Sequence, residues 1–176
     1  MEQMSAAEHV SRDATRQNGL QAGAFSAWTR WTDRASLPGL RFPGVYVIAA
    51  PEVDITAEPF SWRADIVYVG MSNSRGGVGS RLGQFESTLQ GRMGHGGAQR
   101  LYRKHGDCSG LPAGLFVAVR TFECSVTSDD PDDLRAMGCV AKCEYDCFAE
   151  FAEAFGRLPE FNDKARSPKY LSLIHI

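Results

Sequence analysis

Two short apolar segments separated by a polar connection constrain the fold more than any other feature of the sequence. One reads Gly-Val-Tyr-Val-Ile over 44–48 and the other reads Ile-Val-Tyr-Val-Gly over 66–70, so both are rich in β-branched and aromatic residues. Segments of this length and composition are typical of buried strands. Because they lie close together in the sequence, antiparallel pairing is the most economical arrangement. We therefore predict neighbouring strands at about 44–50 and 64–70.

The remaining pattern adds helices and one further strand. A glycine-rich loop follows the second strand, and the spacing of apolar residues then predicts two helices, over about 80–90 and 98–105. Alternation over 115–122 predicts a third strand, and a long helix is expected over 132–155. We therefore expect an α/β fold of the α+β type, in which a small three-stranded antiparallel sheet is flanked by helices in the order β-β-α-α-β-α.

The long helix has clear signals at both ends and one unusual residue on its apolar face. Residues 128–133 supply capping side chains, a proline and acidic groups for the first turn, and Gly156 follows the last turn. A carboxylate in an apolar stripe is paired, bound to a metal ion or raised in pKa, because an isolated buried charge is too costly. We favour a functional role for Glu144 over a helix rotated so that this side chain reaches solvent. The apolar residues that share its helical face are Val140, Phe148, Phe151 and Phe155.

The chain length of 176 residues fits one globular domain. We expect an N-terminal extension over 1–40 that is loose or weakly helical, a main domain over 41–165 and a C-terminal tail over 166–176. The final residues, 171–176, resemble a translated sequencing adapter, so we expect them to be non-native.

Three aromatic residues recur at a spacing of three in the N-terminal extension. Phe25, Trp28 and Trp31 form one apolar stripe if this segment is helical. Packing of the stripe onto the main domain is the favoured interpretation, and a platform for stacking nucleic-acid bases is the alternative.

Composition and cysteine usage indicate a cytoplasmic protein without a membrane partner. No apolar run approaches the roughly 18 residues that would span a bilayer, and the first twenty residues lack the apolar core of a secretory signal. The five cysteines form no disulfide framework, so we expect free thiols in a reducing compartment. Cys139, Cys143 and Cys147 recur every four residues. Zinc sites favour Cys-x-x-Cys pairs, so buried free thiols are the favoured interpretation.

The formal net charge is −2, but the charges are segregated along the chain. Residues 123–153 carry nine acidic side chains and two basic ones. The basic segment 75–104 carries six basic side chains against the single acid Glu86, which suits a polyanionic partner, with a solvated helix face as the alternative. We assign contacts with a nucleic-acid backbone to polar and basic side chains in and just before this segment, which are Ser72, Arg75, Arg92, Arg100, Arg103 and Lys104.

Three features occur in the order that is typical of one nuclease family. Gly44-Val45-Tyr46 is followed by Tyr68-Val69-Gly70 and then by Arg81, and in this signature the chain resembles the GIY-YIG nucleases over roughly residues 40–165. The two tyrosines lie 22 positions apart, so an insertion is looped out between the strands. The resemblance implies a divalent-metal-dependent endonuclease, using Mg²⁺ or Mn²⁺, that hydrolyses phosphodiester bonds in DNA.

The resemblance also implies roles for individual residues. Tyr46 and Tyr68 would form the floor of the site and contact the nucleophilic water and the scissile phosphate. Arg81 would neutralise charge on the phosphoryl oxygens. Glu144 would bind a single divalent ion, and Asn162 would close the site after the long helix. Phosphodiester hydrolysis needs a positioned water, a cation and a guanidinium, so these residue types suit the chemistry on physical grounds as well.

One position departs from the family pattern and bears on proton transfer. Four residues after Arg81 the family often has tyrosine or histidine, whereas this chain has Phe85. His95, in a glycine-flanked segment, would take over the proton transfer, with a surface histidine that has no role as the alternative. Two other functions stay open. One is a catalytically weak nucleic-acid-binding module that retains the fold, and the other is a protein-interaction domain whose basic segment is only a solvated face.

Overall fold

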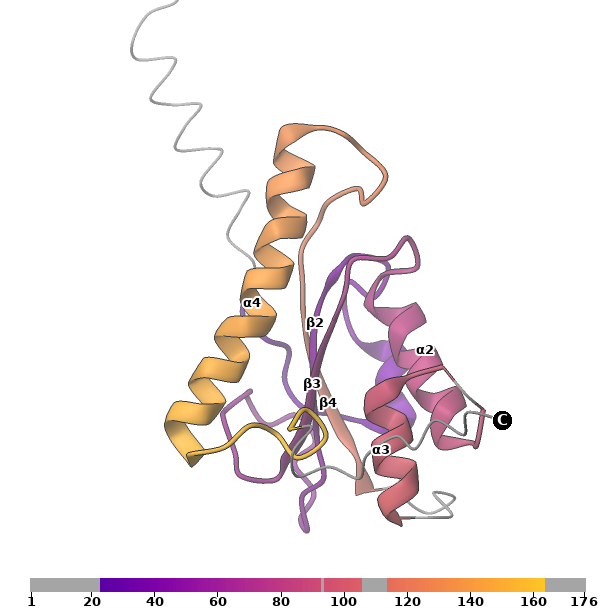
Figure 1. Cartoon of the computed structure of the whole chain (residues 1–176), viewed down its shortest axis with the longest axis vertical. Helices are drawn as coiled ribbons and strands as arrows, with labels where there is room; N and C mark the ends of the chain where they lie inside the picture. The colour runs from indigo at the N-terminus through magenta and orange to yellow at the C-terminus, as the bar shows by residue number, and fades with distance from the viewer. Residues whose placement is uncertain (1–22, 93, 106–113, 164–176) are drawn as a thin grey trace, which may run out of the picture.

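The structure is a computed structural model that describes residues 23–92, 94–105 and 114–163. The expected loose N-terminus and the C-terminal tail fall mainly on residues 1–22 and 164–176, which lie outside the described residues. Figure 1 shows a mixed α+β arrangement in which a four-stranded antiparallel sheet stands between one long helix and a pair of shorter helices. No helix within the described ranges is long and apolar enough to cross a lipid bilayer.

The two apolar segments form the paired strands expected from their composition. β2 (Gly44–Ala49) and β3 (Ile66–Ser72) run antiparallel, with Tyr46 opposite Gly70. β3 extends two residues beyond Gly70, so Ser72 lies at the end of the strand and the glycine-rich loop begins after it. The prediction that this strand ends at residue 70 is therefore wrong.

The sheet has one more strand than the sequence predicts. β4 (Phe116–Thr121) pairs antiparallel with β2 on the side opposite β3. The two-residue strand β1 (Thr29–Arg30) adds to the outer side of β4, and the order across the sheet is β1-β4-β2-β3. The expectation of three strands is wrong because a segment this short carries no detectable alternation.

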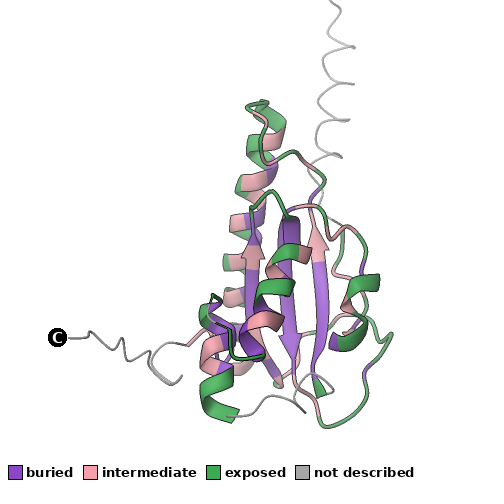
Figure 2. Ribbon diagram, turned by 90° about the vertical axis from the view of Figure 1, so that its right-hand side faces the viewer, coloured by how far each residue is buried: buried purple, intermediate pink, exposed green. Residues whose placement is uncertain are grey.

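Helices cover both faces of the sheet, and the alternation of β2 divides the core into two layers. α2 (Gly77–Leu89) and α3 (Gly96–His105) pack on the face that carries Tyr46, whereas α4 (Pro131–Phe155) packs on the face that carries Val45. Every residue of β2 is buried, as expected of a central strand covered on both faces. Figure 2 shows this burial along the strands and exposed residues on the outer sides of the helices.

The boundaries of α4 confirm the signals read from the sequence. Asp130 is the N-cap, and its side chain accepts a hydrogen bond from the backbone N–H of Asp132. Gly156 ends the helix in the left-handed conformation, with φ of 65°. Within the helix Glu144 is partly buried, and its charge acts on Tyr68 of the edge strand β3.

Trp28 and Trp31 both pack into the core, but on opposite faces of the sheet. Trp28 is 1% exposed and belongs to the layer under α4, whereas Trp31 is fully buried under α2 and α3. The residues between them form β1, and side chains three positions apart on an extended segment point in opposite directions. Trp31 then begins the short 3-10 helix η1 (Trp31–Ser36). Packing onto the domain is confirmed, and the single helical stripe is wrong.

Two glycines allow the tyrosine rings to approach the backbone closely. A Cβ atom on Gly70 would lie 2.6 Å from the Tyr46 hydroxyl oxygen and 2.7 Å from a Tyr68 ring carbon. A Cβ atom on Gly97, in the first turn of α3, would overlap the Tyr68 ring. Any side chain at these positions would therefore displace the tyrosines or the helix.

Replacing Gly97 with alanine should lower the free energy of unfolding by about 1–3 kcal/mol, because the new methyl group overlaps the Tyr68 ring and forces a shift. Gly83→Ala is the matched control, since Gly83 is exposed on α2 with open space around it. That substitution should stabilise the protein by up to about 1 kcal/mol. Urea denaturation measures both changes, and equal effects of the two substitutions would contradict the packing of Tyr68 against α3.

Candidate active site

A buried polar contact joins β2 to the segment that precedes α3. Tyr46 and His95 are both fully buried, and the Tyr46 hydroxyl oxygen lies 2.7 Å from His95 Nε2. The backbone N–H of His95 donates to Thr88 Oγ1 at 3.1 Å, which ties this segment to α2. The alternative of a surface histidine is therefore wrong.

The first turn of α3 fixes which ring nitrogen of His95 carries the proton. The backbone N–H of Ala98 donates to His95 Nδ1 at 3.3 Å, so Nδ1 is an acceptor. Burial, followed by the charge of Arg81, lowers the pKa of His95 to about 3, and the ring is neutral near pH 7. A neutral imidazole with an acceptor at Nδ1 carries its proton on Nε2, so His95 donates to the Tyr46 oxygen.

The two signature tyrosines lie next to each other but differ in exposure. Their ring centroids are 6.0 Å apart, and burial raises the pKa of Tyr46 well above its usual value, with Tyr68 adding to the effect. Tyr68 is only partly buried on the edge strand β3. Burial also raises the pKa of Tyr68, while the charges of Arg81 and Arg100 oppose that rise. Tyr68 is thus the tyrosine that a ligand can reach, and Tyr46 lies behind it.

Arg81 stands at the centre of the ionisable groups in this region. It projects from α2 as a partly buried side chain, and its Nη1 donates to Gln84 Oε1 at 2.7 Å. Its positive charge lowers the pKa of several neighbours from β2, β3, α4 and the segment before α3. These neighbours are Tyr46, Tyr68, His95 and Glu144.

Glu144 faces this group from α4 as a partly buried carboxylate. Burial raises the pKa of Glu144, and the charge of Arg81 only partly opposes that effect. Among the described residues, no side chain forms a hydrogen bond or an ion pair with its oxygens. A purely structural role would pair the Glu144 carboxylate with a buried cation. No such ion pair occurs in the part of the chain that the structure describes.

The donor set around Glu144 fits a hard divalent cation held by one protein carboxylate. No cluster of three or more metal-binding side chains occurs within the described ranges, so a closed protein cage is not formed there. Mg²⁺ is commonly bound by one or two carboxylates together with waters and substrate phosphates. A desolvated, partly exposed carboxylate beside Tyr68 matches that mode of binding.

The Asn162 side chain forms hydrogen bonds with the backbone of β3. Its Oδ1 accepts from the N–H of Val69 at 2.8 Å, and its Nδ2 donates to the carbonyl of the same residue at 2.7 Å. The backbone N–H of Phe161 also donates to the carbonyl of Val67 at 2.9 Å. The turn that follows α4 therefore covers the free edge of β3, the strand that carries Tyr68.

Two of the expected DNA-binding cations hold the same turn in place. Arg100 Nε donates to the carbonyl oxygen of Phe161 at 2.8 Å, and burial lowers the pKa of Arg100. Lys104 forms an ion pair with Glu160 at 2.7 Å. These contacts join α3 to the edge of the sheet.

The other expected DNA-binding residues do not form one patch. Ser72 is 4% exposed, and its hydroxyl group hydrogen-bonds that of Ser74 at 3.0 Å. Arg75 and Arg103 are exposed. Arg75 precedes α2 and Arg92 follows it, so the helix length of about 20 Å separates them.

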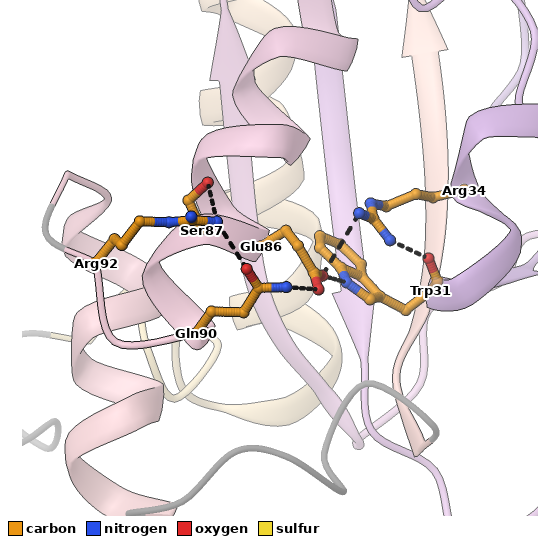
Figure 3. A network of polar contacts seen from close by, with 6 residues as sticks. All are labelled: Trp31, Arg34, Glu86, Ser87, Gln90 and Arg92. Carbon is orange, nitrogen blue, oxygen red and sulfur yellow. Dashed lines mark hydrogen bonds and ion pairs between the residues drawn. The ribbon is translucent and has the colours of Figure 1, made fainter.

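Arg92 belongs to a polar network at the far end of α2, shown in Figure 3. Its Nη2 donates to Gln90 Oε1 at 2.7 Å, and Gln90 in turn donates to Glu86 at 2.9 Å. Glu86 also accepts from the indole N–H of Trp31. The network links η1 to α2 and orients the basic side chain at this end.

Two residues that hydrogen-bond the site residues His95 and Arg81 were not identified from the sequence pattern. Thr88 lies on the buried face of α2 near Phe85, and a polar residue on an apolar face requires a partner, which is His95. Gln84 follows Arg81 by three positions, a spacing at which helical side chains meet.

No model of a known protein family, no curated protein and no solved structure matches this chain. Function is therefore inferred from the side chains that the fold brings together and from the sequence signature that they carry.

The buried neutral His95 should make stability depend on pH. Its pKa is about 3 when folded and about 6.5 when unfolded, so its contribution is complete above pH 6.5 and is lost as the pH falls. Between pH 7 and pH 5 the free energy of unfolding should fall by about 2 kcal/mol more in the native protein than in His95→Gln. Denaturant titrations at several pH values measure this difference, and parallel curves for the two proteins would show that folded His95 takes up a proton normally.

Proposed function

We propose that this chain is a divalent-metal-dependent endonuclease of the GIY-YIG type that hydrolyses phosphodiester bonds in DNA. The observation that carries the proposal is the convergence of a tyrosine pair, a buried histidine, an arginine and a carboxylate from separate elements. Packing alone gives no reason to gather these groups around a partly exposed tyrosine. Hydrolysis of a phosphate ester uses each of them. The succession β2-β3-α2-α3-β4-α4 from residue 44 onward supports the same resemblance.

Arg81 is the group that meets the scissile phosphate in this proposal. Gln84 accepts from one nitrogen of the Arg81 guanidinium, which carries five N–H donors in all. The planar fork is suited to two oxygens at once. Because negative charge grows on those oxygens in the transition state, the contact strengthens as the reaction proceeds.

Tyr68 is the residue that holds the attacking water. His95 donates to the Tyr46 oxygen, and the Tyr46 ring lies beside the Tyr68 ring, with centroids 6.0 Å apart. The positive charges of Arg81 and Arg100 partly oppose the rise that burial causes in the pKa of Tyr68. His95 is thus a positioning residue. Burial keeps the Tyr68 hydroxyl protonated near pH 7, so Tyr68 would orient the attacking water through a hydrogen bond.

Glu144 would bind the Mg²⁺ or Mn²⁺ ion near Tyr68. The ion would supply a Lewis acid for the charge on the leaving oxygen. The Glu144 carboxylate is already partly desolvated and has no hydrogen-bond or ion-pair partner among the described residues. A cation could therefore bind it without displacing an existing interaction.

A catalytically weak nucleic-acid-binding module is the alternative. The residue that favours it is Phe85, which is fully buried where the family often has a tyrosine or histidine. No polar group stands at that helix position to assist Tyr68. The alternative predicts DNA binding without metal-dependent cleavage.

Incubation with supercoiled plasmid tests the proposal. The native protein should produce nicked or linear DNA with Mg²⁺ and none with a chelator. Arg81→Ala should lower cleavage by about 10²-fold or more, because the guanidinium acts mainly in the transition state. Arg81→Lys should restore little, because an ammonium lacks the planar fork.

Arg135→Ala is the matched control for this experiment. Arg135 is an exposed arginine that pairs with Asp132 at the start of α4, away from the tyrosines, and its removal should leave cleavage unchanged. Full activity of Arg81→Ala would mean that the phosphate binds elsewhere. DNA binding without any cleavage by the native protein would favour the alternative function.

A further inference from the structure

A second chemically distinctive cluster lies on the opposite face of the sheet, in the layer under α4. Cys143 and Cys147 are one helical turn apart and are 6% and 4% exposed. Both are free thiols, and both lie on the buried side of α4. The proposed hydrolysis makes no use of either sulfur.

The two thiols line a cavity of about 400 Å³ between α4 and the segments around residues 24 and 61. Arg120 reaches the cavity from β4, and its Nη1 donates to Cys143 Sγ at 3.7 Å. The aromatic side of the cavity is formed by Phe25, Phe60 and Trp62. A cavity of this volume admits a small reagent directly beside the sulfurs.

The acidic residues at this cavity have partners of their own. Asp146 forms an ion pair with Lys142 at 2.6 Å, and Glu150 accepts from the indole N–H of Trp62 at 2.6 Å. Arg120 is therefore the charged side chain that contacts the Cys143 sulfur directly. A guanidinium beside a sulfur stabilises negative charge that develops on it during nucleophilic attack.

We propose that Cys143 and Cys147 form an oxidation-sensitive thiol pair whose co-reactant is a small hydroperoxide. The Cys143 sulfur attacks the O–O bond of hydrogen peroxide, which forms a sulfenic acid and releases one water. The Cys147 sulfur then displaces the sulfenic hydroxyl, which forms the S–S bond and releases a second water. The two thiols together lose two protons and two electrons, and the peroxide is reduced to water.

Helix geometry allows the disulfide but makes it strained. Residues four apart on an α-helix have Cα atoms about 6 Å apart, which is within the range that disulfides span. Their Cβ atoms are about 5–6 Å apart and have to approach to about 4 Å. The turn must therefore tighten, and Glu144 lies in that turn. Strained disulfides are readily reduced, so the modification is reversible.

Packing alone does not account for this arrangement. Buried free cysteines commonly serve as small apolar residues, and that role needs neither a second thiol one helical turn away nor a guanidinium directed at the sulfur. It also does not need a cavity beside the pair. The combination of these three features distinguishes Cys143 and Cys147 from the other described cysteines, Cys124 and Cys139.

Peptide mapping by mass spectrometry tests the proposal on the full chain without reference to DNA cleavage. Reduced protein is treated with hydrogen peroxide, quenched with an alkylating reagent and digested. The peptide that contains residues 143–147 should lose two hydrogen atoms and regain them with dithiothreitol. The pair should react about tenfold faster or more than Cys124, although Cys124 is the more exposed thiol.

Cys147→Ser separates the two steps. In this variant Cys143 should still be oxidised, and dimedone should trap the sulfenic acid there because no second thiol displaces it. The proposal is overturned if Cys124 reacts first while the pair stays reduced. It is also overturned if Cys143 of the variant gives no dimedone adduct.

Discussion

The buried hydrogen bond between Tyr46 and His95 is the interaction on which the geometry of the site depends. A buried polar atom without a partner costs about 1–3 kcal/mol, so β2 and the segment before α3 are held at the distance that joins these two side chains. The other polar atoms of His95 are satisfied by Thr88 and by the first turn of α3. Gly97 then lets α3 lie against the Tyr68 ring. The Tyr46–His95 hydrogen bond and its neighbours thereby set the positions of β2, α2 and α3 relative to one another and to Tyr68.

Tyr68 is partly exposed and lies on the edge strand β3, which pairs with the sheet on one side only. The backbone of β3 therefore needs hydrogen-bond partners on its other side. The turn after α4 supplies the missing support through the paired hydrogen bonds of Asn162 with Val69. Arg100 ties that turn back to α3. Side chains that were expected to bind DNA thus hold the turn against β3, and the Tyr68 side chain on this supported strand remains partly exposed.

Sequence patterns predicted the elements whose stability is local. β2 and α4 follow from side-chain propensity and from the caps at Asp130 and Gly156. β1 did not follow, because a two-residue strand is stabilised only by its pairing with β4. The residue types of the site were predicted by the family resemblance, but their partners were not. Glycine neighbours made His95 look exposed, and counting charges did not reveal that Arg100 and Lys104 are engaged by the turn after α4.

The central claim is that Glu144 binds a divalent ion beside Tyr68, and burial of its carboxylate without a partner implies that this function costs stability. Electron paramagnetic resonance of Mn²⁺, titrated into protein saturated with an uncleavable DNA oligonucleotide, tests it most directly. We predict one bound ion for the native protein and for Glu153→Gln, an exposed position on the same helix. Glu144→Gln should lose that ion yet unfold, without metal, at the same temperature or higher. Unchanged Mn²⁺ binding by Glu144→Gln would contradict the claim.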